Sequence, residues 1–120
     1  MKILFIEDDV EVAGLLAEVF RDEGHETRVA YSGEEGLAAI GRDRPDAVFL
    51  DVRLPKKSGI TVLREIRQAD AALPVIILTG HAGPEDLAAA KRLGVTEVIA
   101  KSEVLNHFSE ALARVTGSRA

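Results

Sequence analysis

The chain has 120 residues, 47% of them hydrophobic and 29% charged, which is the size and composition of one globular domain. No apolar run approaches the ~20 residues of a membrane span, and the absence of cysteine excludes disulfides, thiol nucleophiles and thiolate metal sites. A net charge of -5 with no basic block and 4% aromatic residues argues against direct nucleic-acid binding. We therefore expect one domain over residues 1–120, cytoplasmic, with no membrane or nucleic-acid partner.

The chain begins with a predicted strand and a core-facing helix. Residues 3–6 are a continuous apolar run, typical of a strand covered on both faces. Asp9 is a candidate N-cap for the following helix, and Gly24 is its expected end. The apolar stripe expected to face the core consists of Val12, Leu15, Leu16, Val19 and Phe20.

A less buried strand and a short helix come next. Residues 26–30 alternate between polar and apolar side chains, which favours a strand with one exposed face. Ser32 followed by Glu35 has the form of a capping box. The helix that it opens is predicted to end near Gly41 and to be weakened by Gly36.

The most informative stretch is the apolar run over residues 47–50, which ends in Asp51. Its lack of alternation predicts a central strand of a parallel sheet, since both faces of such a strand are covered by helices. Pro45 before it and Pro55 after it favour a strand over a buried helix. A helix is then predicted from Gly59 to Asp70, with Val62, Leu63 and Ile66 facing inward.

The fourth strand–helix unit covers residues 74–79 and a helix that starts at Pro84. Pro suits the first turn of a helix, and Gly94 is the expected end. The apolar stripe of this helix is thin, with Leu87 and Leu93 among alanines. We therefore expect it to be the most mobile helix.

The last unit is a strand over residues 98–101 and a helix capped by Ser102. The inward residues expected in this helix are Leu105, Phe108, Leu112 and Val115. Five strands alternating with five helices predict an α/β fold with a doubly wound parallel sheet. The pattern leaves two strand orders open, 3-2-1-4-5 and 2-1-3-4-5.

Polar side chains follow the predicted strands at their carboxyl ends. They are Glu7 and Asp8 after the first strand, Asp51 at the third, Thr79 at the fourth and Lys101 at the fifth. In the order 2-1-3-4-5 these ends converge, because strands 1 and 3 are then neighbours at the switch point where ligands bind. Lys101 starts two strands away, but its long stem reaches back toward Asp51.

Three carboxylates at one sheet edge repel one another, by roughly 3 kcal/mol per pair at about 5 Å and an effective dielectric constant of about 20. A Mg²⁺ ion relieves this repulsion, because it prefers a few carboxylate oxygens, retained waters and phosphate oxygens. A carboxylate beside Mg²⁺, a lysine and a hydroxyl is equipped to attack phosphorus. We expect Asp51 to form an aspartyl phosphate, with Thr79 and Lys101 stabilising the phosphoryl oxygens.

The chain resembles the receiver domains of bacterial two-component response regulators over essentially its whole length. The matching residues are Glu7-Asp8, Asp51 with Pro55 and Gly59 after it, Thr79-Gly80 and Lys101. The resemblance implies a flavodoxin-like fold with strand order 2-1-3-4-5 and five helices on both faces. It implies phosphoryl transfer to Asp51 from a histidine kinase or phosphotransfer protein. It also implies that Asp8 binds Mg²⁺ directly and that Glu7 binds it through water. The backbone carbonyl of Arg53 is implied as a further ligand.

A receiver is a phosphoacceptor signalling domain that catalyses only its own phosphorylation and dephosphorylation, so we do not expect an enzyme with separate substrates. The chain ends soon after its last predicted helix, which favours a stand-alone receiver that signals through a partner or a relay. The expected partner face consists of the fourth helix, the fifth strand and the fifth helix.

Two positions depart from the family pattern. Ser102 replaces the usual proline after the lysine, so a trans peptide bond is expected there. Val98 replaces the usual tyrosine or phenylalanine, so the common threonine–aromatic relay cannot operate in its usual form. Both departures give weight to an alternative, a pseudo-receiver that binds proteins without being phosphorylated.

Two enzymatic or cofactor-binding alternatives fit less well. An aspartyl-phosphate hydrolase needs a second aspartate two positions after its nucleophile, where this chain has Arg53. A flavin-binding module needs a phosphate loop after the first strand, where the acidic residues 7–9 would repel a phosphate.

Overall fold

The computed structural model describes residues 1–54, 56–80 and 83–101. Over these residues, strands and helices alternate as β1 (Lys2–Ile6), α1 (Val10–Asp22), β2 (Glu26–Ala30), α2 (Gly33–Arg42), β3 (Ala47–Asp51), α3 (Gly59–Ala69), β4 (Val75–Thr79), α4 (Pro84–Arg92) and β5 (Glu97–Ala100). The predicted fifth helix lies outside the described residues. Among the helices that are described, none is both long and apolar enough to traverse a bilayer.

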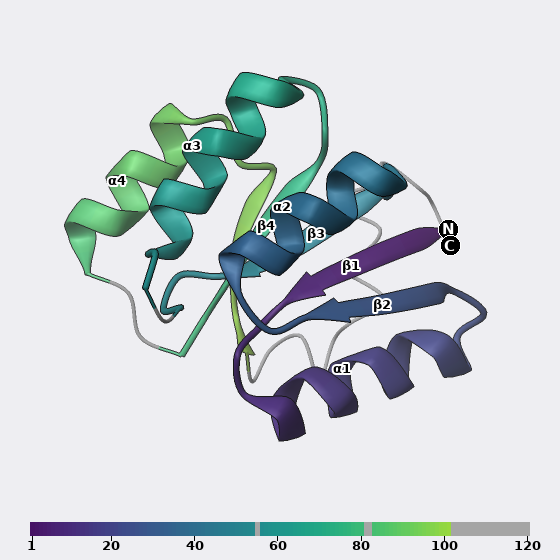
Figure 1. Ribbon diagram of the computed structural model, residues 1–120. Coiled ribbons are helices and arrows are strands. Elements are labelled where there is room, and N and C mark those ends of the chain that lie inside the picture. Colours follow the sequence, from purple (N-terminus) through teal and green to yellow (C-terminus); the bar gives the residue numbers. More distant parts are fainter. Residues whose placement is uncertain (55, 81–82, 102–120) are drawn as a thin grey trace.

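The five strands form one parallel sheet in the order β2-β1-β3-β4-β5 (Figure 1). This is the order that the resemblance implies, and it rules out the 3-2-1-4-5 order. Every residue of the central strand β3 is buried, as its continuous apolar run predicts. The edge strand β2 is mostly half-buried, in agreement with its alternating sequence.

The sheet separates two cores. On one face, α1 packs on the sheet through a cluster that includes Phe5, Phe20 and Phe49. On the other face, α2, α3 and α4 lie over an aliphatic cluster that includes Val48, Leu63 and Ile77 (Figure 1). The inward residues predicted for α3, which are Val62, Leu63 and Ile66, are all buried.

The orientation predicted for α1 is partly wrong. Leu15 is 48% exposed, and the buried stripe consists of Ala13, Leu16, Ala17 and Phe20. Leu16, Ala17 and Phe20 belong to the core cluster between this helix and the sheet. The start of the helix is as predicted, because the Asp9 side chain accepts hydrogen bonds from the backbone N–H groups of Glu11 and Val12 at 3.0 and 3.2 Å.

The start of α2 holds a modified capping box. The Ser32 hydroxyl accepts from the Glu35 N–H at 3.2 Å, as predicted. The Glu35 carboxylate reaches one residue further back and accepts from the Tyr31 N–H at 2.7 Å. Gly36 is buried against β1, where an added Cβ would lie 2.4 Å from Cδ1 of Ile6, so this glycine allows close helix–sheet contact.

The strand β5 begins one residue earlier than predicted. It covers Glu97–Ala100, so Lys101 follows the strand instead of ending it. Its partner is β4, in a register that pairs Thr79 with Ala100. The Lys101 side chain therefore leaves from the sheet edge where the acidic residues lie.

Candidate functional site

Glu7, Asp8 and Asp51 meet at the carboxyl edge of the sheet. The pair Glu7-Asp8 follows β1 directly, and Asp51 ends the neighbouring strand β3. One carboxylate oxygen of each residue lies within 4.8 Å of the others. Glu7 and Asp51 are only 1% and 4% exposed, whereas Asp8 is exposed. The predicted convergence of the three carboxylates is thus confirmed by the fold, with two of them buried and one at the surface.

The Lys101 ammonium group joins the two buried carboxylates. Its Nζ donates a hydrogen bond to Oδ2 of Asp51 at 3.2 Å and forms an ion pair with Oε1 of Glu7. The contact with Asp51 agrees with the predicted reach of the lysine. The contact with Glu7 was not predicted, although glutamate at this position, with its longer side chain, is a sequence signal that favours it.

Backbone N–H groups fix the orientation of both buried carboxylates. Oδ1 of Asp51 accepts from the N–H of Arg53 at 3.1 Å, and Oε2 of Glu7 accepts from the N–H of Asp9 at 3.2 Å. In each carboxylate, therefore, one oxygen accepts a hydrogen bond from a backbone N–H group and the other contacts the Lys101 ammonium group. These contacts hold Asp51 in one orientation before any ligand binds.

Gly59, the first residue of α3, packs directly on the backbone of Asp51. The Gly59 N–H donates to the Val52 carbonyl at 2.7 Å, and an added Cβ on Gly59 would lie 2.2 Å from the Asp51 carbonyl oxygen. A side chain at position 59 would thus displace the backbone that carries Asp51.

Burial and charge determine the proton affinities in the site. Burial raises the pKa of Glu7 to about 7, with the Asp51 carboxylate adding to the shift and Lys101 opposing it. Burial by itself would lower the pKa of Lys101, but the Glu7 and Asp51 carboxylates outweigh it and raise that pKa. Lys101 is therefore a permanent cation in this site.

Thr79 supplies a hydroxyl at the end of β4, the strand beside β3. Its Oγ1 atom is buried and makes no hydrogen bond within the part of the chain that the structure describes. A buried hydroxyl without a partner is costly, so this atom suits an incoming acceptor such as a phosphoryl oxygen.

A magnesium ion fits the donor set. Three carboxylates offer oxygen atoms within 4.8 Å of one another, which is the hard, anionic environment that Mg²⁺ prefers. Asp8 at the surface and the two buried carboxylates would hold it. The ion would offset the repulsion that Lys101 alone neutralises only in part.

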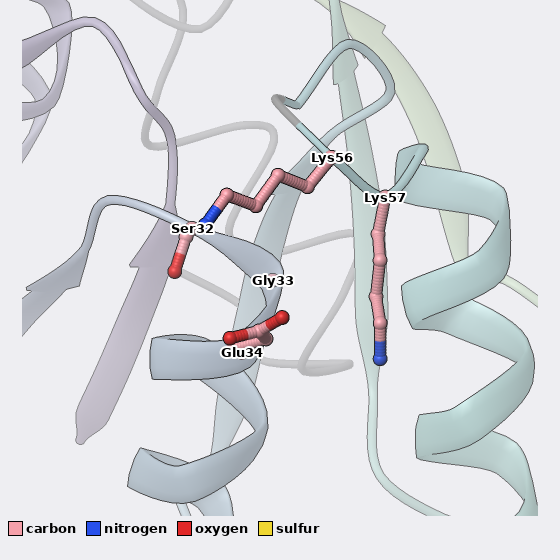
Figure 2. Close-up of a pocket in the computed structure, with 5 residues that line it drawn as sticks. All are labelled: Ser32, Gly33, Glu34, Lys56 and Lys57. Carbon is pink, nitrogen blue, oxygen red and sulfur yellow. The ribbon is translucent and has the colours of Figure 1, made fainter.

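Lys56 and Lys57 lie outside this cluster. They line a hollow of about 90 Å³ at the start of α2, together with Ser32, Gly33 and Glu34. Figure 2 shows Lys56 extending toward Ser32, whereas Lys57 runs along α3, where its ammonium pairs with Glu65 at 3.0 Å. The two lysines point in different directions, so they do not form a joint phosphate clamp.

The two departures from the family pattern have different outcomes. Val98 is half-buried in β5 and packs against the aliphatic core, so an aliphatic side chain occupies this position of the fold. Ser102 and the peptide bond before it lie outside the described residues.

Comparison with known proteins identifies the family. The family model of the response regulator receiver domain matches residues 3–113. Sporulation initiation phosphotransferase F of Bacillus subtilis (strain 168) is 32% identical over 113 residues, which are 94% of this chain and 91% of that protein. The crystal structure of the receiver domain of NtrX from Brucella abortus superimposes with a TM-score of 0.88 at 34% identity, covering 98% of this chain and 99% of that one.

The chain belongs to the response regulator receiver domain family. It is also 32% identical over 123 residues to the transcriptional regulatory protein RprY of Bacteroides fragilis (strain YCH46), a match covering 99% of this chain and 52% of RprY. The chain thus spans about half the length of this relative.

Proposed function

We propose that Asp51 accepts a phosphoryl group in a Mg²⁺-dependent reaction and that residues 1–120 act as one receiver domain. The observation that carries this proposal is the arrangement around Asp51. Its carboxylate is buried, held by the Arg53 N–H and by Lys101, and grouped with Glu7 and Asp8. A buried carboxylate with fixed orientation, an adjacent cation and a metal-binding set is suited to attack phosphorus.

The proposed step conserves atoms and charge. An Asp51 oxygen forms a bond to phosphorus while the bond from phosphorus to the donor's histidine nitrogen breaks, and its electron pair stays on the imidazole. Lys101 and the Thr79 hydroxyl donate to the phosphoryl oxygens as their charge increases. Bound Mg²⁺ would supply further charge neutralisation, held by Asp8 and Asp51, by Glu7 through water, and by the Arg53 carbonyl.

Membership of the family supports a proposal about the partners. We propose a histidine kinase or a phosphotransfer protein as the donor, and a protein that binds the face of α4 and β5, with the predicted fifth helix, as the recipient of the signal. The cytoplasmic location, the stand-alone form and the absence of nucleic-acid binding stay predictions.

Mass spectrometry of the intact protein tests the proposal. Incubation with a small acyl-phosphate donor and Mg²⁺ should add about 80 Da, the mass of one phosphoryl group. Asp51→Asn should abolish the added mass, and omission of Mg²⁺ should reduce it strongly. Asp22→Asn, which changes an exposed carboxylate in α1, is the matched control and should behave as wild type.

An unmodified wild-type protein would contradict the proposal and favour the pseudo-receiver alternative. An Asp51→Asn variant that still gains the mass would show that another residue is the acceptor.

A further inference from the structure

The strand β2 forms one edge of the sheet, and among the described strands it pairs with β1 alone (Figure 1). The Glu26 N–H and the Ala30 carbonyl make hydrogen bonds of 3.0 and 2.9 Å to the residues that flank β1, so both groups face that strand. In a parallel ladder, the backbone groups of alternate residues point to opposite sides of the strand. The N–H and C=O groups of Thr27 and Val29 therefore face the open edge, where they can pair with a further strand.

The sequence of β2 does little to protect this edge. Edge strands commonly avoid pairing with other chains through proline, lysine or a bulge. β2 contains neither proline nor lysine, and its pairing with β1 is continuous from Glu26 to Ala30. Its basic side chain, Arg28, donates to the Asp43 carbonyl at 2.8 Å and is thereby held by its own chain. The edge of β2 is therefore suited to accept a strand from another molecule.

A groove of about 280 Å³ lies beside this edge, between β2 and α2. Two exposed residues of opposite charge line it, Glu35 and Arg42, which are two helical turns or about 10.5 Å apart along α2. The exposed Ala38 lies between them. Arg42 forms no hydrogen bond or ion pair with the residues that the structure describes, so its guanidinium group is available to a carboxylate of another molecule. The groove is lined by Val29, Ala30, Glu35, Ala38, Ala39 and Arg42.

The charges of this groove are complementary to those of a second copy of the chain. A two-fold axis brings the same surface of two copies together and reverses its direction, so each acidic end meets a basic end. We propose that two copies associate through this surface, with their β2 strands paired antiparallel around Val29 and each Glu35 against Arg42 of the other copy. A second copy supplies both charges at the required spacing, which an unrelated strand does only if it carries the same pattern.

This dimer leaves the candidate site open. The strand β1 lies between β2 and β3, so Asp51 is two strands away from the shared edge. Antiparallel pairing of the two β2 strands directs the carboxyl edges of the two sheets to opposite ends of the dimer. The inference therefore does not rest on phosphorylation of Asp51 and stands or falls separately from the proposed function.

Sedimentation velocity of the full chain tests the association. One strand edge and one helix face make a small interface, so we expect a weak dimer that forms between about 10 µM and about 1 mM protein. The salt concentration should be about 0.15 M, because two chains that each carry a net charge of -5 repel each other at low ionic strength. Over this range the mean mass should rise toward twice that of one chain. A protein that stays monomeric throughout would overturn the proposal.

Charge reversal identifies the surface that is used. Arg42→Glu and Glu35→Arg should each raise the dissociation constant at least about tenfold, because like charges then meet twice in the dimer. An equimolar mixture of the two variants should regain association, since each copy supplies the charges that the other needs. Arg64→Glu makes the same change at an exposed residue of α3 and should leave the dissociation constant unchanged. Wild-type association of Arg42→Glu, or a mixture of folded variants that stays monomeric, would contradict the two-fold arrangement.

A steric variant keeps the test open if a charge variant does not fold. Glu35→Arg also removes the bond to the Tyr31 N–H, so circular dichroism must show that this variant is folded. If it is not, Ala38→Gln takes its place, because it adds a side chain inside the groove while keeping a good helix former. It should raise the dissociation constant about tenfold. Association as tight as in wild type would overturn the proposal.

Amide chemical shifts measured by NMR at increasing protein concentration locate the interface. The amides of residues 27–30 and 35–42 should shift, whereas those of residues 87–98 should stay constant. Shifts confined to residues 87–98 would overturn the proposal, because the copies would then associate through α4 and β5.

Discussion

Glu7 holds its proton more tightly in the folded chain than in the unfolded one, because burial raises its pKa from 4.5 to about 7. A raised pKa in the folded state stabilises the fold below pH 4.5 and loses that contribution as pH rises through 7. Without Mg²⁺, we expect the free energy of unfolding to fall by up to about 3 kcal/mol from this group between pH 4.5 and 8. Urea denaturation at a series of pH values measures this fall in the free energy of unfolding.

Glu7→Gln is the control for this pH dependence. Other groups titrate in the same window, including His25, whose pKa is lowered by burial and by the nearby amino terminus. The His25 shift does not depend on Glu7, so His25 contributes equally to both proteins and cancels in the difference between wild type and variant. Parallel stability curves over this pH range would contradict the assignment.

At the scale of single residues, the position of a residue in the chain predicted where it lies in the fold. The contacts of its side chain were harder to predict. The carboxyl ends of the strands indicated Glu7, Asp8, Asp51 and Lys101, because parallel strands end at one edge. The ion pair between Lys101 and Glu7 was missed, since it depends on side-chain length and orientation. Thr79 was among the predicted site residues, but the sequence could not show that its hydroxyl is buried without a hydrogen bond to the described residues.

At the scale of elements, two glycines of α2 allow a matched prediction. Gly36→Ala should destabilise the protein by about 1–3 kcal/mol, because the added Cβ would clash with Cδ1 and Cγ1 of Ile6 in the core. Gly41→Ala, in the same helix, has no atom within 4 Å of the added Cβ and should stabilise by about 0.5–1 kcal/mol. Urea denaturation of both variants measures the difference.

The sign of each change distinguishes two roles of glycine. If Gly36→Ala were as stabilising as Gly41→Ala, helix propensity would dominate at both sites and the close contact with β1 would be unimportant. The sequence indicated that Gly36 weakens α2, but it could not show that the sheet requires the space. Leu15 gives a related lesson, because periodicity identified an amphipathic helix, but the buried stripe includes the small residues Ala13 and Ala17 and leaves Leu15 exposed.

At the scale of the whole molecule, Mg²⁺ should raise the melting temperature. An ion that binds only the folded chain adds about 1.4 kcal/mol at a tenfold excess over its dissociation constant. For a domain of this size, we expect an increase of about 5 °C. Thermal unfolding followed by circular dichroism, with and without Mg²⁺, measures this shift.

Two variants show whether the ion binds at the acidic cluster. Asp8→Ala removes the exposed carboxylate of the cluster and should abolish the shift, whereas Asp22→Ala in α1 should retain it. A shift of equal size in both variants would mean that Mg²⁺ acts elsewhere or through ionic strength.

The global architecture was predictable in class but not in detail from patterns alone. Buried apolar strands that alternate with amphipathic helices indicate a parallel α/β sheet, yet both common strand orders satisfy that pattern. Only the family resemblance predicted the order β2-β1-β3-β4-β5, which the structure shows.

The division of the core by the sheet also has a spectroscopic consequence. Phe5, Phe20 and Phe49 form one cluster with ring centroids 5.2 Å apart, all on the α1 face, while the described residues of the opposite core are aliphatic. Ring currents will therefore disperse the methyl resonances of Ile3, Leu16 and Ile76 on the aromatic side. The chain has no tryptophan ring that would add to these shifts. The methyl groups of the two cores can therefore be distinguished by chemical shift without any introduced label.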